Sequence, residues 1–281
     1  MKKSTILLSI LLSTGIVSTS FSQKTLTKIW ETDTLISTPE SVVFDTKSKA
    51  LYVACINGAP TATNEKSFIS KLDLNGKITQ LKVTENLHAV KGLDVLDGNI
   101  YVAEIFKLVE IDAKTGQVLH KYEVPNATFL NGVSVDQKNK VVYFTDMRSD
   151  RLWKLEKGQL VKVAEGAPLK TPNGVFFEND KLIIGNGDGK ILALDLKTQQ
   201  YATIAEGMGG LDGILSDGQK GYFATEWRGK IWHINPEGKT QLLLDTVDAK
   251  MNTADIEYIP SQKILLVPTF WKNKVIAYKV N

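Results

Sequence analysis

A motif that recurs roughly every 40 residues constrains this chain more than any other feature of its sequence. One copy begins with the apolar run 171–177, headed by Asn173 and Gly174, and continues through the runs 181–186 and 190–195. Turn residues separate the three runs. Because Asn, Asp and Gly supply the backbone angles of tight hairpins, each copy predicts a meander of antiparallel strands.

Six copies align on the residue at the head of the first strand. These head residues are Glu40, Lys91, Asn131, Asn173, Asp212 and Asp255, and they lie 51, 40, 42, 39 and 43 residues apart in succession. Such spacing is typical of β-propeller blades. We therefore predict an all-β fold, a six-bladed β-propeller, with a parallel β-solenoid or two β-sandwiches as the alternatives.

The sixth copy reaches Asn281 directly after its third strand. The strand-like run 25–31 precedes the first copy and can supply the missing fourth strand. An open sheet edge would expose unpaired backbone groups, whereas a closed ring leaves only short, protected edges. We therefore expect the N-terminal strand to close the last blade.

The first 22 residues have the pattern of a signal peptide. Lys2 and Lys3 precede an apolar segment at 6–17, and small polar residues follow at 18–23. The apolar segment is short for a membrane span, so an uncleaved anchor is the less favoured alternative. We predict a signal peptide at 1–22, a single propeller domain at 23–281, export to the periplasm or the medium, and no membrane association after cleavage.

Charge and cysteine content bear on nucleic-acid binding and on disulfide bonds. The formal net charge is +3, and it falls to +1 without residues 1–22, which carry two Lys and no acidic residue. This balance gives no indication of nucleic-acid binding. Cys55 is the only cysteine, so the chain has no internal disulfide, and we predict a buried structural thiol.

The head residues are candidates for a metal site. In a propeller the innermost strands line the central channel, so equivalent positions at their heads converge on the axis. Glu, Asn and Asp all provide oxygen ligands, which suit a hard divalent cation: Ca²⁺ first, with Mg²⁺, Mn²⁺ or Zn²⁺ as alternatives. Asn-Gly and Asp-Gly also form turns on their own account. A turn does not explain Glu40 followed by Ser41, or the gathering of carboxylates and amides at one register.

The head motifs also resemble those of a known family. Pro39-Glu40-Ser41, Leu130-Asn131-Gly132, Pro172-Asn173-Gly174 and Leu211-Asp212-Gly213, in this order, resemble the gluconolactonase and senescence marker protein family and, more distantly, the paraoxonases. The resemblance covers essentially all of the chain after residue 22. It implies a six-bladed propeller with a divalent metal held by Glu40, Asn131, Asn173 and Asp212, and it implies that Asp212 is the general base in lactone hydrolysis.

Lys91 and Asp255 depart from that family pattern. Lys91 can pair with Asp255 or with a substrate carboxylate, or it can repel the cation and weaken the site. Asp255 is either an additional ligand or the counter-ion of Lys91. The sequence favours the ion pair between them.

Further candidates lie where the second strands end, which we expect at the same face. These residues are Glu104, Asp146, Asn186, Glu226 and Thr269, with Phe106, Arg148, Trp227, Arg228 and Trp271 as neighbouring walls. From them we select Glu104, Asp146, Glu226 and Trp227, together with Lys91 and Asp255, as candidate substrate contacts. Loop residues of this kind are often only solvated. His88 is a weaker acid–base candidate, and the insertion 57–67 is a candidate lid.

Two functional classes are consistent with these residues. The first is an exported, metal-dependent hydrolase of a lactone or related ester, with a small-molecule substrate. Here a metal would polarise the carbonyl while Asp212 accepts a proton from water. The second is an exported propeller that binds a small ligand or a protein without catalysis, because one fold hosts many functions.

Overall fold

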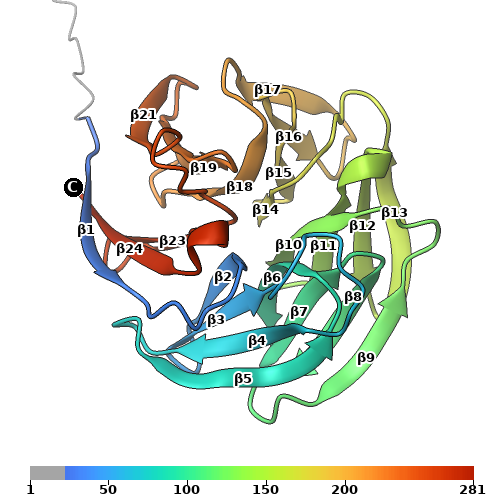
Figure 1. Ribbon diagram of the computed structural model, residues 1–281. Helices are drawn as coiled ribbons and strands as arrows, with labels where there is room; N and C mark the ends of the chain where they lie inside the picture. Colours follow the sequence, from blue (N-terminus) through green and yellow to red (C-terminus); the bar gives the residue numbers. More distant parts are fainter. Residues whose placement is uncertain (1–22) are drawn as a thin grey trace, which may run out of the picture.

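The strands form six four-stranded antiparallel sheets that stand in a ring around a central axis (Figure 1). The computed structural model describes residues 23–281, so the predicted signal peptide lies outside the described residues. The prediction of a six-bladed β-propeller is confirmed. Within the described part of the chain, no helix is long and apolar enough to cross a bilayer.

Each of the first five blades uses four consecutive strands, with the first strand innermost. The first three blades are β2 (Pro39–Asp45), β3 (Ala50–Cys55), β4 (Ser67–Leu72) and β5 (Ile78–Leu87); β6 (Val90–Leu96), β7 (Asn99–Glu104), β8 (Lys107–Asp112) and β9 (Val118–Glu123); and β10 (Leu130–Asp136), β11 (Val141–Asp146), β12 (Arg151–Glu156) and β13 (Gln159–Glu165). The next two are β14 (Val175–Glu178), β15 (Lys181–Gly185), β16 (Ile191–Asp195) and β17 (Tyr201–Ala205); and β18 (Leu211–Ser216), β19 (Tyr222–Glu226), β20 (Lys230–Ile234) and β21 (Thr240–Asp245).

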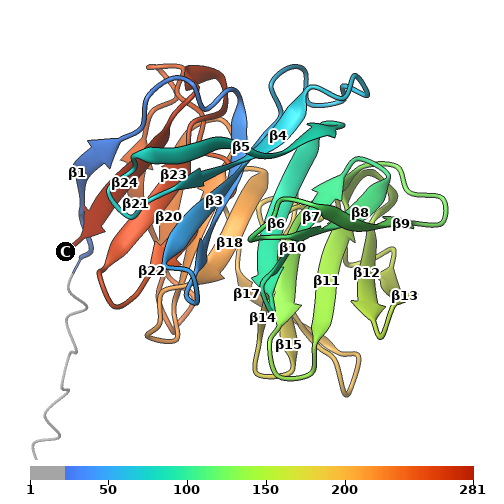
Figure 2. The same cartoon turned by 90° about the horizontal axis from the view of Figure 1, so that it is seen from below.

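The sixth blade combines the two ends of the described chain. Its order is β22 (Glu257–Ile259), β23 (Ile264–Pro268), β24 (Val275–Val280) and β1 (Leu26–Glu31), and both views show β1 alongside β24 (Figure 1 and Figure 2). The two strands are antiparallel, with Leu26 opposite Val280 and Glu31 opposite Ile276. The predicted closure by the N-terminal strand is confirmed.

The β1 segment also contacts the two blades on either side. The Gln241 side chain of blade five exchanges two hydrogen bonds with the backbone of Lys24, at 3.1 and 2.8 Å. On the other side, the Trp30 ring covers Gly76 in blade one, where an added Cβ would lie 2.5 Å from the ring. The segment that closes blade six therefore holds three blades together.

Hairpin chemistry matches the sequence signals. Asn179 and Asp180 connect β14 to β15 with positive φ angles of 48° and 62°, as a two-residue type I′ turn requires. Among residues 23–281, two 3₁₀ turns, η1 (Met147–Ser149) and η2 (Phe270–Lys272), come after the second strands of blades three and six.

The core is divided among the spaces between blades. Among the described residues, six apolar clusters each join two neighbouring blades, as in the cluster that packs Val43 of β2 against Val95 of β6. The second strands are enclosed on both sides, and β3 and β11 are buried along their entire length. Cys55 is a buried free thiol at the end of β3, as predicted.

Candidate functional site

The head residues meet at the axis because glycines let the inner strands approach closely. The glycines that follow four of the heads are Gly92, Gly132, Gly174 and Gly213. A Cβ on Gly132 would lie 2.4 Å from the Asn173 carbonyl oxygen, and one on Gly174 would lie 2.3 Å from that of Asp212. None of these four glycines has a positive φ. Close packing between blades therefore explains them better than turn formation does.

The last head joins the first through the backbone. The Asp255 amide donates to the Glu40 carbonyl at 2.9 Å, and the Ser41 hydroxyl donates to the Asp255 carboxylate at 3.0 Å. Blade one has Ser41 where blades two to five have glycine, so its side chain takes part in closing the ring. The head residues come together in this way, as the repeat predicts.

Irregular strand pairing occurs at the heads of four inner strands. The register between the first and second strands shifts at the heads in four blades, for example between Leu130 and Val133 and between Leu211 and Ile214. A bulge leaves a residue unpaired and re-aims its side chain. The Thr145 side chain links the heads of blades three and four. Its Oγ1 accepts from the Gly132 amide at 2.9 Å and donates to the Asn173 carbonyl at 2.8 Å.

This packing gives a first prediction. Replacing Gly174 with Ala should lower the melting temperature by about 4–8 °C, because overpacking costs about 2 kcal/mol. The new methyl group would push the Asp212 backbone away from Asn173. Thermal unfolding followed by circular dichroism measures the effect. A variant as stable as the parent would show that the neighbouring strand can yield without cost.

Two ring carboxylates are buried with few partners. Glu40 is 3% exposed, and its Oε2 has no hydrogen-bond partner among residues 23–281. Burial raises its pKa well above the usual range; Lys91 opposes this rise, while the charges of Asp212 and Asp255 add to it. Burial also raises the pKa of Asp212 to about 7, against the effects of Lys91 and of a 2.7 Å hydrogen bond from Asn173 Nδ2.

Lys91 lies in the ring but does not pair with Asp255. It is 2% exposed, and its Nζ lies 5.1 Å from the centroid of the Phe129 ring. Burial lowers its pKa, and the charges that oppose this effect are those of Glu40 and Asp212. Asp255 instead accepts the Ser41 hydroxyl, and no ion pair joins it to Lys91. The favoured ion pair is therefore wrong, because the head of blade two faces the carboxylates of blades one and five.

The four residues expected to hold a metal provide two carboxylates and two amides. Asn131 directs Nδ2 to Met147 Sδ at 3.8 Å and Asn173 directs Nδ2 to Asp212, so neither amide oxygen is used in these contacts. With the unpartnered Glu40 oxygen, this donor set fits a hard divalent cation. Within residues 23–281, no three His, Cys, Asp or Glu side chains group to hold a metal, so the amides are essential to the proposed set.

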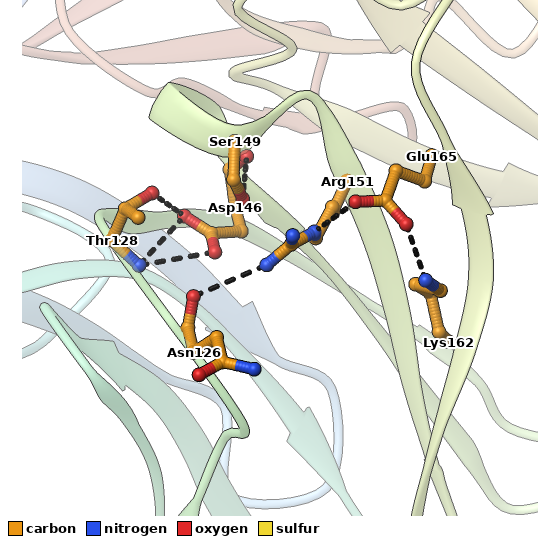
Figure 3. A network of polar contacts seen from close by, with 7 residues as sticks. All are labelled: Asn126, Thr128, Asp146, Ser149, Arg151, Lys162 and Glu165. Carbon is orange, nitrogen blue, oxygen red and sulfur yellow. Dashed lines mark hydrogen bonds and ion pairs between the residues drawn. The ribbon is translucent and has the colours of Figure 1, made fainter.

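The residues that end the second strands mainly hold loops of their own blade. Asp146 accepts from the Phe129 amide at 2.8 Å. It also accepts from the Thr128 backbone and hydroxyl (Figure 3). In the same view Arg151 binds Glu165 and the Asn126 carbonyl, which fixes the segment that leads into β10. Asp146 is fully buried, so its contacts are those of loop support, and the substrate contact expected of it stays a prediction.

Glu104 and Glu226 also accept hydrogen bonds from the loops that precede their blades. Glu104 is almost fully buried and accepts from the His88 amide at 2.6 Å, although its Oε2 has no partner in the described chain. Glu226 accepts from Gly209 N at 2.8 Å and from Trp232 Nε1 at 2.7 Å. Asn186 likewise accepts from the Lys170 amide. These contacts support the loops that precede the blades, and Glu226 also lines a surface pocket together with Arg228 and Lys230.

An apolar cluster forms next to the ring. It consists of Ile56, Ala89, Ile105, Phe129, Ala254 and Phe270, with Met147 packed against it. Two tryptophans flank its Phe270 at near-perpendicular angles, Trp227 at 5.3 Å and Trp271 at 4.8 Å between ring centroids. They are 38% and 49% exposed. The two rings therefore present an exposed aromatic surface beside the cluster, and their role as walls of a ligand site stays a prediction.

The insertion 57–67 connects to blade two. The Ala89 amide donates to the Ala62 carbonyl at 2.9 Å, and Ser67 Oγ donates to the Ile56 carbonyl at 2.7 Å. Its role as a lid stays a prediction.

A second group of polar side chains was not found by sequence reasoning. Asp94, Ser134 and Glu257 line a cavity of about 80 Å³ on the axis, and each accepts a backbone amide of the next blade at 2.9 Å. Burial raises the pKa of Asp94 to about 7 and that of Glu257 to about 8. The available signal is a polar residue inside an apolar inner strand, as in Leu93-Asp94-Val95.

Comparisons with known proteins support the fold. No family model and no curated protein match the sequence. Among solved structures, a catalytically inactive virginiamycin B lyase from Staphylococcus aureus with quinupristin is 14% identical, covers 92% of this chain and 99% of its own, and has a TM-score of 0.65. A gluconolactonase from Xanthomonas campestris is 14% identical, with coverages of 87% and 86% and a TM-score of 0.65.

A third similar structure is an auxiliary nutrient binding protein from Bacteroides ovatus. It is 12% identical, covers 86% of this chain and 69% of its own, and has a TM-score of 0.65. Two of these names denote enzymes and one denotes a binding protein. Identities this low show a shared propeller fold and leave the activity to be argued from the site.

Proposed function

We propose that this protein is an exported hydrolase of a lactone or related ester, with a divalent cation on the propeller axis. Glu40, Asn131, Asn173 and Asp212 would hold the cation, with Ca²⁺ the first choice and Mg²⁺, Mn²⁺ or Zn²⁺ the alternatives. The observation that carries the proposal is the unpartnered Glu40 oxygen, buried in the same ring as Asp212 and two amides. A buried carboxylate oxygen without a hydrogen bond is costly unless a cation or proton satisfies it.

Asp212 has the properties of a general base in this proposal. Burial raises the pKa of its carboxyl group to about 7 before any cation binds, and a carboxylate within hydrogen-bond reach of a water can act as a general base. Asp212 would take a proton from the attacking water while the water oxygen bonds to the carbonyl carbon. The ring C–O bond then breaks, and the proton passes to the leaving oxygen to give the hydroxy acid. The chemistry that a bound cation supplies is polarisation of the carbonyl and stabilisation of negative charge on its oxygen.

Asn173 positions the base. Its Nδ2 donates to Asp212 Oδ1 at 2.7 Å, which orients the carboxylate. The Asn173 backbone is fixed in turn by Thr145 of the preceding blade.

Chelation tests the proposal directly. The purified protein is assayed against a panel of sugar-acid and small aliphatic lactones, before and after EDTA treatment, and then with each of the four cations restored. We expect hydrolysis that EDTA abolishes and that one cation restores, with about one equivalent of that metal per chain by elemental analysis. Hydrolysis that persists after the metal is removed would contradict the assignment.

A ligand-binding protein without catalysis is the second candidate. The apolar cluster beside the ring and the exposed Trp227 and Trp271 favour it, because exposed aromatic rings offer rigid surfaces for contact with a ligand. Such a protein would bind its ligand equally well with and without EDTA. Export rests on the N-terminal 22 residues alone and is part of the proposal.

A further inference from the structure

We propose that Lys91 determines the affinity of the ring for divalent cations, because its ammonium already balances Glu40 and Asp212 and any added cation must bind against that positive charge. The inference rests on the proposed cation site and adds to it a residue that the metal ligands alone do not suggest.

The position of Lys91 supports this role. It is the head of blade two, in the same bulged register as Glu40, Asn131 and Asp212, and it is almost completely buried. Its charge acts mainly on Glu40 and Asp212, the two carboxylates of the proposed ligand set. No carboxylate among residues 23–281 forms an ion pair with it. The ammonium therefore lies in the ring without a carboxylate at ion-pair distance among the described residues.

The aromatic contact keeps the charge in place. Lys91 Nζ lies 5.1 Å from the centroid of the Phe129 ring, and the Arg148 guanidinium carbon lies 4.3 Å from the same centroid. A cation over an aromatic face is stabilised by the ring quadrupole. The Phe129 backbone is itself fixed by Asp146. We therefore expect the Lys91 side chain to stay in the ring when a divalent cation binds.

Charge balance gives the size of the effect. With Lys91 charged, the two carboxylates and the ammonium sum to one negative charge, whereas without it two negative charges face the ion. For a cation that binds within a few ångströms of the ammonium, Coulomb's law at an effective dielectric constant of about 20 predicts at least about a tenfold difference in cation affinity.

The test is a calorimetric titration of Ca²⁺ into the purified protein and into Lys91→Met, which keeps the length and apolar stem of the side chain. We expect the dissociation constant of Lys91→Met to be at least about tenfold lower. Arg148→Met is the matched control: it removes an exposed cation on the same aromatic ring, and we expect a change of less than about threefold because solvent screens exposed charges. Equal affinities of the parent and Lys91→Met, or weaker binding by the variant, would overturn the inference.

A second variant and a second measurement separate this inference from the proposed function. Lys91→Gln must show the same direction of change, and circular dichroism must show that both variants are folded. If Ca²⁺ supports hydrolysis by the parent but Lys91→Met binds it no more tightly, only the role of Lys91 is wrong. If neither protein binds any of the four cations, both the inference and the metal-dependent function are wrong.

Discussion

Asp212→Asn should reduce the turnover of a lactone substrate by about 100-fold or more, because a positioned general base contributes a factor of about 10² to 10⁴. The substitution is nearly isosteric and keeps an oxygen that can accept the Asn173 Nδ2 hydrogen bond. It removes the ability to take a proton at neutral pH. Asp212→Ala removes the base and a proposed metal ligand together, so we expect that variant to be inactive and to bind Ca²⁺ more weakly.

The comparison of the two Asp212 variants separates proton transfer from metal binding. Steady-state kinetics with saturating Ca²⁺ measures the first, and calorimetry measures the second. Asp245→Asn is the matched control, since it removes an exposed carboxylate from the outer strand of the same blade and should retain full activity. If Asp212→Asn turns over as fast as the parent, Asp212 is not the base.

Removal of residues 23–31 should prevent the protein from folding to a soluble monomer. The deletion strips β24 of its only outer neighbour and exposes a row of unpaired backbone groups, which promotes aggregation. It also removes the hydrogen bonds between Lys24 and Gln241 and the Trp30 contact with Gly76. Size-exclusion chromatography and the recovery of soluble protein measure the result. A soluble, cooperatively unfolding deletion variant would show that five complete blades hold the ring without β1.

A milder test uses two neighbouring residues of the same strand. Trp30→Ala should lower the melting temperature by about 4–8 °C, because losing the contact of a half-buried indole costs about 2 kcal/mol. Ile29→Ala should change it by less than about 2 °C, because Ile29 lies in a bulge and is exposed. Equal effects from the two substitutions would contradict the packing described for Trp30.

The architecture could be predicted from the sequence because it depends on repeated, local signals. Turn pairs such as Asn179-Asp180 mark hairpins, and the regular spacing of the heads gives the blade count. The closure by β1 follows from counting strands, since the last copy lacks one. Each of these features depends on backbone hydrogen bonds, and the identity of neighbouring side chains affects those bonds little.

The site was less predictable because its contacts join residues that are distant in the sequence. Lys91 and Asp255 have opposite charges at equivalent positions, yet the Asp255 carboxylate accepts a hydrogen bond from Ser41 of the adjoining blade. Asp146 resembles a ligand-binding residue in the sequence, but the loop before β10 uses its oxygens. Glycines after the heads resemble turn residues, whereas the next blade occupies the space that a Cβ would need. Sequence spacing identifies the register of a side chain but not its partner.

The order in which β1 and β24 are made has a consequence for biogenesis. β1 is the first described strand to be synthesised and β24 is the last, so blade six cannot be completed until translation has delivered residues 275–280. Until then β1 has no partner strand and the ring stays open.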